Sequence, residues 1–238
     1  MSGPIQCLDH DLRGQLHPRP LSHLVELGGG RSLNCAMSSH AFAIRPARPT
    51  HHEGLLFARF MNLAADGGFR KMFGPRFEQI VATAYLHPSH DLSYEYAVFA
   101  EVDGAVAGMA SGYTAEQHAS FNDAAFKEAA GRDAVRIACI LWLISPMWRF
   151  LHTYNSGDFY LQFLAVDEAH RQKGMGRALM QHMESRGRSC SCTRFTLDVS
   201  SRNPNAQRLY AQQGLQPVGR WPRLPLMPAA VRRMVKPL

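Results

Sequence analysis

A short basic, glycine-containing run that could hold an anion lies between an apolar segment and an amphipathic one. The run is Arg171-Gln172-Lys173-Gly174-Met175-Gly176, and the apolar segment before it ends in Leu164-Ala165-Val166. Such an order is typical of a strand, a tight loop and a helix. Backbone N–H groups at the start of the helix can point at one anion, and glycine allows its close approach. The pattern therefore indicates a phosphate-binding loop.

The loop does not match two well-known phosphate-binding patterns. It is not the dinucleotide-binding G-x-G-x-x-G, and no G-K-[ST] follows to make a nucleoside-triphosphate loop. An ordinary tight turn between strand and helix is the simpler alternative.

A second constellation lies further along the chain. Asn203 is suited to be a helix N-cap, Pro204 to be the first helical residue, and Gly214 to close the helix. Tyr210 follows Asn203 by nearly two helical turns, so the two side chains are expected on the same side of the helix.

Together the two motifs resemble those of the GNAT superfamily of N-acetyltransferases. Arg171-x-x-Gly174-x-Gly176 after Leu-Ala-Val resembles the acetyl-coenzyme A binding motif. Asn203-x-x-Ala206-x-x-x-Tyr210-x-x-x-Gly214 is similar to a second motif of that family, with Leu215 in place of the usual Phe. The resemblance covers roughly residues 41–235 and leaves out the N-terminal segment and the residues before the central strand.

The resemblance implies an α/β fold, with a mixed central sheet of about six to seven strands flanked by helices. It also implies transfer of an acetyl group from acetyl-coenzyme A to a primary amine of a small molecule or protein, by direct attack in a ternary complex. The expected cofactor-binding residues are Leu164, Ala165, Val166, Arg171, Gln172, Lys173, Gly174, Met175, Gly176, Arg177, Asn203 and Tyr210. Backbone around Leu164 to Val166 would stabilise the developing oxyanion.

Two residues are expected to move protons. By resemblance, Tyr210 donates to the leaving thiolate; with cysteine as a proxy, the pKa values of thiol and phenol differ by about 1.5 units, or about 2 kcal/mol against full transfer. Asp198, on the polar face of the strand before Asn203, is the leading candidate for the base that deprotonates the amine. Packing of Tyr210 against Ala206 and Leu209 is the alternative for the first role.

For the base, other assignments stay open. Glu101, Tyr160 and Gln162 are alternatives, the last two as residues that orient water or substrate. Asp198 could instead be a capping or surface residue, or face Arg194. Asn203 could contact the cofactor, cap its helix, or do both.

Composition limits the class of protein. Of 238 residues, 46% are hydrophobic and 19% charged, as in globular proteins, and the net charge of +7 favours anionic partners. No block of like charges appears, so the sequence does not favour nucleic acid as a partner. The five cysteines and twelve histidines show no zinc or H-E-x-x-H spacing, so we expect reduced thiols, no metal site and a cytoplasmic protein. The longest apolar stretch, Ile137 to Met147, is too short to span a bilayer, and no membrane partner is expected.

Taken in order, the chain predicts a mobile leader over residues 1–36 and one domain over residues 37–238. A strand from Ala41 and two amphipathic helices precede a hairpin whose turn is Asp103-Gly104. Residues 113–157 are expected to form a helical insertion, either a lid or wall over the acceptor site or a packing or dimer surface. Strands are expected at residues 194–199, 215–221 and 231–235.

The sequence leaves the acceptor amine, the acyl chain length and the choice between monomer and homodimer open. A second function remains in view, because the family fold could serve as a non-catalytic acyl-coenzyme A sensing or interaction module. RNA or ribosome association through the basic surface is a third, and it would require steep salt dependence.

Overall fold

The computed structural model describes residues 42–223 and 228–238, so the predicted leader lies outside the described residues. In chain order the helices and strands are β1 (Ala43–Pro46), α1 (His51–Ala64), α2 (Gly68–Phe73), α3 (Phe77–Tyr85), β2 (Ala97–Val102), β3 (Ala105–Thr114), α4 (Ala115–Ala119), α5 (Ala124–Ala130), α6 (Ala134–Leu143), α7 (Ser145–Leu151), β4 (Asp158–Val166), α8 (Met175–Ser189), β5 (Arg194–Ser200), α9 (Pro204–Gln212), β6 (Gln216–Trp221) and β7 (Val231–Pro237). Short 3₁₀ turns precede β2, α6 and α8.

The strands form one mixed sheet of seven strands, which confirms the predicted architecture. Their order is β1-β2-β3-β4-β5-β7-β6. All neighbours are antiparallel except β4 and β5, which are parallel. The predicted hairpin is confirmed, since Val102 pairs with Ala105 across the Asp103-Gly104 turn. Asp103 and Gly104 both have positive φ, which this turn requires.

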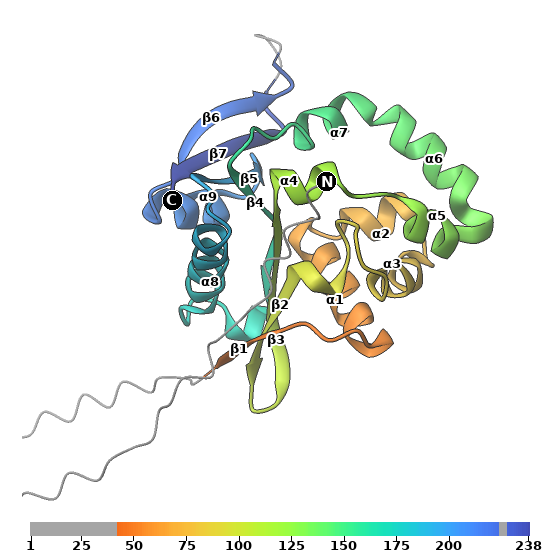
Figure 1. The fold of residues 1–238 in the computed structure, drawn as a ribbon, viewed down its shortest axis with the longest axis horizontal. Helices are drawn as coiled ribbons and strands as arrows, with labels where there is room; N and C mark the ends of the chain where they lie inside the picture. Colours follow the sequence, from red (N-terminus) through yellow and green to blue (C-terminus); the bar gives the residue numbers. More distant parts are fainter. Residues whose placement is uncertain (1–41, 224–227) are drawn as a thin grey trace, which may run out of the picture. The chain divides into compact units, whose positions relative to one another are not determined.

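Helices cover the two faces of the sheet, as Figure 1 shows for α8 on one side and α1 to α3 on the other. In α3 the apolar residues recur at helical spacing and are buried against α1 and α2; they are Phe77, Ile80, Val81, Ala84 and Tyr85. On the opposite face, Met175, Leu179 and Met183 of α8 pack against β5 through Phe195 and Leu197. The helical spacing of the apolar residues therefore determines which sides of α3 and α8 are buried.

The region between β1 and β2 differs from the prediction in one respect, because it contains three helices and not two. The chain turns at Asp66 and Gly67, both with positive φ, and starts the separate helix α2. A break in the helical spacing shorter than one turn is not visible in the sequence pattern.

Residues between β3 and β4 form helices α4 to α7, as expected for the insertion. The first begins with a capping box, in which the side chains of Thr114 and Gln117 each accept from the other residue's backbone N–H. Helices α5 and α6 contact α3 and α2, and α7 approaches β7 (Figure 1). The insertion thus connects the helices on one face of the sheet to its far strands.

Among the described residues, no single helix has the length and apolar character needed to cross a bilayer. Only two segments taken together, Ala124–Leu143 and Ser145–Leu151, reach that length and composition, and they are bent by 77° relative to each other.

Candidate active site

The central strand β4 carries a bulge where it crosses the middle of the sheet. Ser111 of β3 pairs with Phe163, and the next residue, Gly112, pairs with Leu161, so Gln162 is left as the extra residue of β4. The parallel pairing of β4 with β5 also ends at Leu161, opposite Leu197, although β4 continues to Val166. The two strands therefore part at the bulge.

Beyond the bulge, β4 stays paired with β3 but has no strand partner among the described residues on the side of β5. Backbone N–H groups point alternately to the two sides of a strand. Beyond Gln162, those on the side of β5 have no ladder acceptor there. The stretch predicted to stabilise an oxyanion, Leu164 to Val166, lies in this segment.

The backbone N–H groups of residues 172–177, at the end of the loop after β4 and the start of α8, form no hydrogen bonds with the backbone of the described residues. Gln172 (φ +62°) and Gly174 (φ +83°) are both left-handed, and alternation of this kind turns successive N–H groups toward one concave side. Helix α8 begins at Met175 with no side-chain cap and no acidic residue in its first turn. An anion can therefore complete this helix terminus.

The basic side chains of the loop are exposed around that terminus. Arg171, Gln172, Lys173 and Arg177 all face solvent. Arg171 donates from Nε to the carbonyl of Val166 at 3.1 Å, which holds its guanidinium near the end of β4. Hydrogen-bond donors and positive charge are therefore concentrated at these residues, and anion binding there stays a prediction.

Gly176 lies where α8, α9 and β4 meet. A Cβ there would be 3.7 Å from Leu209 and 3.8 Å from Val166, which is ordinary contact distance. Folding therefore does not require glycine at this position. The lack of a side chain leaves the N–H groups of the first turn open to a ligand.

Helix α9 positions the second motif beside the first. Asn203 caps the helix, because its Oδ1 accepts from the N–H of Ala206 at 3.0 Å. Tyr210 is buried with Leu164 and Val166 of β4, and burial raises the pKa of its hydroxyl to about 12. No hydrogen bond to that hydroxyl is formed by another described residue. Tyr210 is thus a buried donor next to the parted end of β4.

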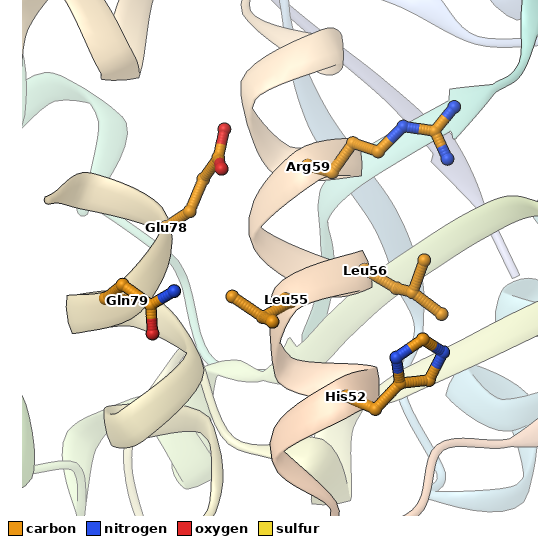
Figure 2. A pocket seen from close by; sticks show the side chains of 6 residues that line it. All are labelled: His52, Leu55, Leu56, Arg59, Glu78 and Gln79. Carbon is orange, nitrogen blue, oxygen red and sulfur yellow. The ribbon is translucent and has the colours of Figure 1, made fainter. Parts of the chain in front are cut away.

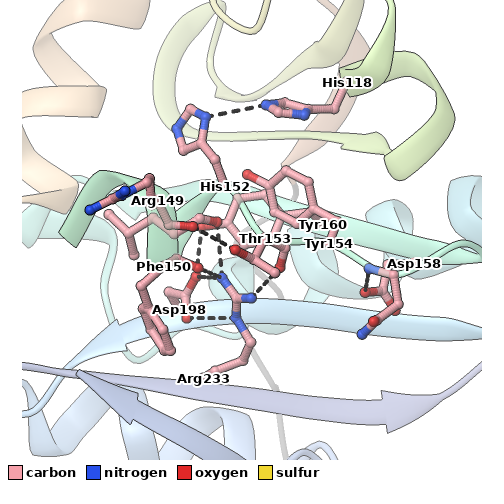
Figure 3. Close-up of polar contacts among 12 residues, drawn as sticks. His118, Arg149, Phe150, His152, Thr153, Tyr154, Asp158, Tyr160, Asp198 and Arg233 are labelled. Atoms are coloured by element: carbon pink, nitrogen blue, oxygen red, sulfur yellow. Dashed lines mark hydrogen bonds and ion pairs between the residues drawn. The ribbon is translucent and has the colours of Figure 1, made fainter. Parts of the chain in front are cut away.

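Asp198 lies in a buried ion pair, shown in Figure 3. Its Oδ1 accepts from Arg233 Nε at 3.1 Å, and its Oδ2 accepts from Arg233 Nη2 at 2.7 Å and from Tyr160 Oη at 3.1 Å. The side chain is only 4% exposed. Arg194 pairs with Asp158, so a contact between Asp198 and Arg194 is not the one that forms. Burial raises the pKa of Asp198, and Arg233 opposes that rise.

Arg233 also binds the end of the insertion. Its Nη2 donates to the carbonyl oxygens of Phe150 at 2.8 Å and Leu151 at 2.9 Å, and its Nη1 donates to that of Thr153. These are carbonyls at the C-terminal end of α7, where a cation is favourable. Sequence reasoning did not single out Arg233, because its partners lie some 80 positions away along the chain.

An aromatic wall lies beside Tyr160, on the sheet face that also bears Asp198. It consists of Tyr96, Tyr113, Phe121, Tyr154 and Tyr160, with neighbouring rings 4.7–6.2 Å apart. Its members come from both the sheet and the insertion. Burial holds the pKa of Tyr160 and of Tyr113 well above the usual range, so both are neutral donors.

Asp91 is a carboxylate that sequence reasoning missed. It follows α3, is partly exposed, and its Oδ2 accepts from Gln162 Nε2 at 3.1 Å. Gln162 Oε1 in turn accepts from Ser111 Oγ at 3.3 Å. Burial, followed by the nearby negative charge of Asp123, raises the pKa of Asp91 to about 6. Asp91 is therefore linked directly to the bulge residue of the central strand.

The loop that carries Asp91 is fixed by a buried histidine. His90 Nε2 donates to the carbonyl of Ala84 at 2.7 Å, and its Nδ1 accepts from the N–H of Leu92 at 3.2 Å. This arrangement needs the neutral ring, and burial lowers the pKa of His90 accordingly. Residues 87–93 show no periodic pattern, so the sequence does not indicate a role for His90 or Asp91.

Glu101, another candidate base, is occupied elsewhere. Arg45 of β1 donates to its Oε1 from Nε and Nη2, at 2.8 and 2.6 Å, and lowers the pKa of the carboxyl. Glu101 pairs with Ala43 at the edge of the sheet, whereas β3 separates β2 from β4. Of the three carboxylates Asp198, Glu101 and Asp91, Asp91 is the one that contacts the bulge residue, and it is partly exposed.

A separate hollow of about 350 Å³ lies between α1 and α3 (Figure 2). It is lined by His52, Leu55, Leu56, Arg59, Glu78 and Gln79. None of the predicted site residues lines it. One of its lining residues, Arg59, pairs with Asp167, the residue that follows β4, at 2.5 Å.

Comparison with known proteins agrees with this geometry. A family model described as the acetyltransferase (GNAT) family matches residues 68–215. No curated protein matches the sequence significantly. Among solved structures, the chain is similar to one described as an acetyltransferase (21% identity, TM-score 0.58, covering 82% of this chain and 98% of that one). It is also similar to an N-acetyltransferase from Staphylococcus aureus Mu50, with 15% identity and a TM-score of 0.56, covering 82% of this chain and 100% of that one. A third similar structure is Ard1 from Thermoplasma volcanium, with 19% identity and a TM-score of 0.51, covering 83% of this chain and 98% of that one.

The bulged and parted central strand is thus followed by a loop and a helix terminus whose N–H donors have no backbone partner among the described residues. The chain belongs to the acetyltransferase (GNAT) family, and acyl transfer is the class of reaction that this membership supports. The resemblance stated from the two sequence motifs is confirmed. Among the described residues, no group of three or more His, Cys, Asp or Glu side chains is placed to hold a metal ion.

Proposed function

We propose that this protein transfers an acetyl group from acetyl-coenzyme A to the amine of a small molecule or peptide. The observation that carries the proposal is the run of unused N–H groups at residues 172–177, directly beyond the parted end of β4. These donors and the exposed basic side chains fit the pyrophosphate of coenzyme A. Hydrogen bonds to such a charged acceptor contribute about 1.5 to 3 kcal/mol each.

The bound donor supplies a thioester carbonyl for direct attack by the amine. A C–N bond forms as the carbonyl oxygen becomes an oxyanion, and the C–S bond then breaks to release the thiolate. Backbone N–H groups of Leu164 to Val166 that face the parted side of β4 are the proposed donors to the oxyanion. They are fixed by the sheet, so they need no rearrangement when charge develops.

We propose that Asp91 accepts the proton that the attacking amine must lose. A carboxylate with an ordinary pKa of about 3.9 is a weak base for an ammonium group, and raising that pKa to about 6 reduces the cost of proton transfer by about 3 kcal/mol. Gln162 holds the carboxylate at the bulge, and His90 holds the loop. Accessibility and contact with the bulge residue favour Asp91 over the other carboxylates.

Asp198 is given a positioning role in this proposal. It was the leading candidate for the base on sequence grounds, but its oxygens already accept three hydrogen bonds from Arg233 and Tyr160. A carboxylate so paired and so little exposed is poorly placed to reach an amine. Through Tyr160 and Arg233, it holds the aromatic wall and the end of α7.

Tyr210 is the proposed proton donor to the departing thiolate. With a pKa of about 12, its phenol lies about 3.5 units above a thiol at 8.5, or about 5 kcal/mol against complete transfer. It therefore stabilises the sulfur mainly by a hydrogen bond. Asn203 is proposed to serve as helix cap and cofactor contact together.

The test is release of free thiol from acetyl-coenzyme A in the presence of pooled amines, amino acids, polyamines and N-terminal peptides. Wild type should release thiol with at least one pool, and Asp91→Asn and Tyr210→Phe should lower the rate while coenzyme A binding is kept. Tight binding without release in any pool would contradict the proposal and favour a sensing module. The cytoplasmic location and the monomeric or dimeric state stay predictions.

A further inference from the structure

One side of α6 exposes large apolar side chains. Val135, Trp142 and Leu143 are 76%, 78% and 73% exposed, and Cys139 between them also faces solvent. Residues three, four and seven positions apart lie along one side of a helix. These four residues, called here the α6 surface, therefore form a continuous apolar stripe.

The opposite side of the same helix is already packed. Ile137 is buried in the core formed with α1 to α3, and Ile140 and Leu141 pack against that core. A helix that is apolar all round is typical of a buried or membrane-bound segment, and not of one that faces water. The α6 surface is thus a second apolar face that the described part of the chain does not cover.

From the start of α6 to the end of α7 the charged side chains are arginines, and the nearest carboxylates before them, Asp133 and Glu128, precede α6. Residues 134–157 contain no Asp or Glu. Arg132 lies just before α6 and Arg149 lies on α7; both are exposed, and neither forms an ion pair with another described residue. Arg136 is engaged by Asp133 and by the carbonyl of Phe73. An apolar stripe with a free arginine beyond each end is suited to an anionic partner.

The same charges argue against self-association through this face. Two α6 surfaces brought together would each carry the same flanking arginines, Arg132 and Arg149, and residues 134–157 offer no carboxylate to pair with them. Like charges brought together at an interface are unfavourable. A partner with distributed negative charge avoids this repulsion.

We propose that the α6 surface docks onto the anionic face of a lipid bilayer. Trp142 is suited to the boundary between headgroups and acyl chains, and arginines near a membrane surface are attracted by anionic lipids. The bend of 77° between α5–α6 and α7 fits a segment that lies along the surface instead of crossing it.

The test is sedimentation of the full chain with vesicles of phosphatidylglycerol and phosphatidylcholine, against vesicles of phosphatidylcholine alone. We expect binding to the anionic vesicles that weakens with salt. Trp142→Asp should weaken it at least tenfold, and Arg132→Gln or Arg149→Gln about fivefold each. Ala105→Asp, at the exposed first residue of β3, is the matched control and should bind as wild type does.

A second readout separates docking from general charge attraction. On binding, tryptophan emission should shift to the blue and be quenched by brominated lipids. Trp142→Phe should still bind, but the blue shift and the quenching should be largely lost. Trp148 and Trp221 remain in this variant and supply its residual emission. Absence of binding at low salt, or equal binding by Trp142→Asp and Ala105→Asp, would overturn the proposal. So would a dimer in solution that Trp142→Asp dissociates, because this face would then be an interface between copies.

Discussion

Arg233 of β7 donates to both carboxylate oxygens of Asp198 on β5, and it also donates to the carbonyls of Phe150 and Leu151 at the end of α7 (Figure 3). One guanidinium therefore joins two strands of the sheet to the insertion. Its side chain is 12% exposed, so the pair is largely shielded from water. This contact is one of those that hold the insertion against the sheet.

Replacing the arginine should strongly destabilise the fold. Arg233→Leu leaves the Asp198 carboxylate buried without its partner, and we expect a loss of about 3–5 kcal/mol in the free energy of unfolding, measured by urea denaturation. Arg232→Leu, at the exposed neighbouring position, should change it by less than about 0.5 kcal/mol.

The double variant Arg233→Leu/Asp198→Asn removes the stranded charge, so it should recover part of the lost stability. Equal stability of Arg233→Leu and wild type would contradict the structural role of the pair.

Loss of the Asp91 carboxylate should affect the rate and its pH dependence. We expect the wild-type rate to rise with pH through about 6, as Asp91 loses its proton. Asp91→Asn should lower the rate by about 10²-fold or more and abolish this rise with pH, without weakening coenzyme A binding. The measurement is thiol release from pH 5 to 8.

Asp123→Asn supplies the control for that profile. The negative charge of Asp123 helps to raise the pKa of Asp91. Its removal should therefore move the rise in rate to lower pH, while the rate at high pH stays the same. If the rate of Asp91→Asn still rises with pH through about 6, a group other than Asp91 is the base.

Titration of the Asp91 carboxyl should also make the free energy of unfolding depend on pH. Its pKa is about 6 in the folded protein and about 3.8 when unfolded, so between these values the folded state binds more protons. Stability contributed by the protonated carboxyl is therefore lost as pH rises from about 4 to about 6. The unfolding free energy of wild type minus that of Asp91→Asn should fall over this window, and a flat or rising difference would contradict the raised pKa.

Gly176 tests the anion-binding loop. A Cβ there makes only ordinary contacts with Leu209 and Val166, so Gly176→Ala should leave the melting temperature nearly unchanged. It should weaken coenzyme A binding about tenfold or more by titration calorimetry, because the methyl group obstructs the N–H groups of the first turn. Unchanged affinity in Gly176→Ala would place the ligand elsewhere.

The sequence predicts those parts of the fold and site whose residues are neighbours along the chain. The loop at 171–176, the cap at Asn203 and the apolar stripe of α3 each depend on contacts within a few positions, and local chemistry determines them. The family follows from two such local motifs.

What the sequence does not predict depends on pairing across the fold. The bulge at Gln162 is set by its register with β3, on the far side of the insertion. Asp91 reaches Gln162 over 71 positions, and Arg233 reaches Asp198 over 35. Neither contact has a periodic signature, so the proposed base and the anchor of the insertion became visible only in three dimensions.

The most direct measurement is mass spectrometry of both protein and amines after the full chain is mixed with acetyl-coenzyme A and the pooled acceptors. Direct transfer predicts an acetylated amine formed in step with free coenzyme A, and no acetyl group left on the protein when amines are omitted. A protein that binds acetyl-coenzyme A but acetylates no amine in any pool would contradict the account. So would an acetylated side chain that forms first and then passes its acetyl group to the amine.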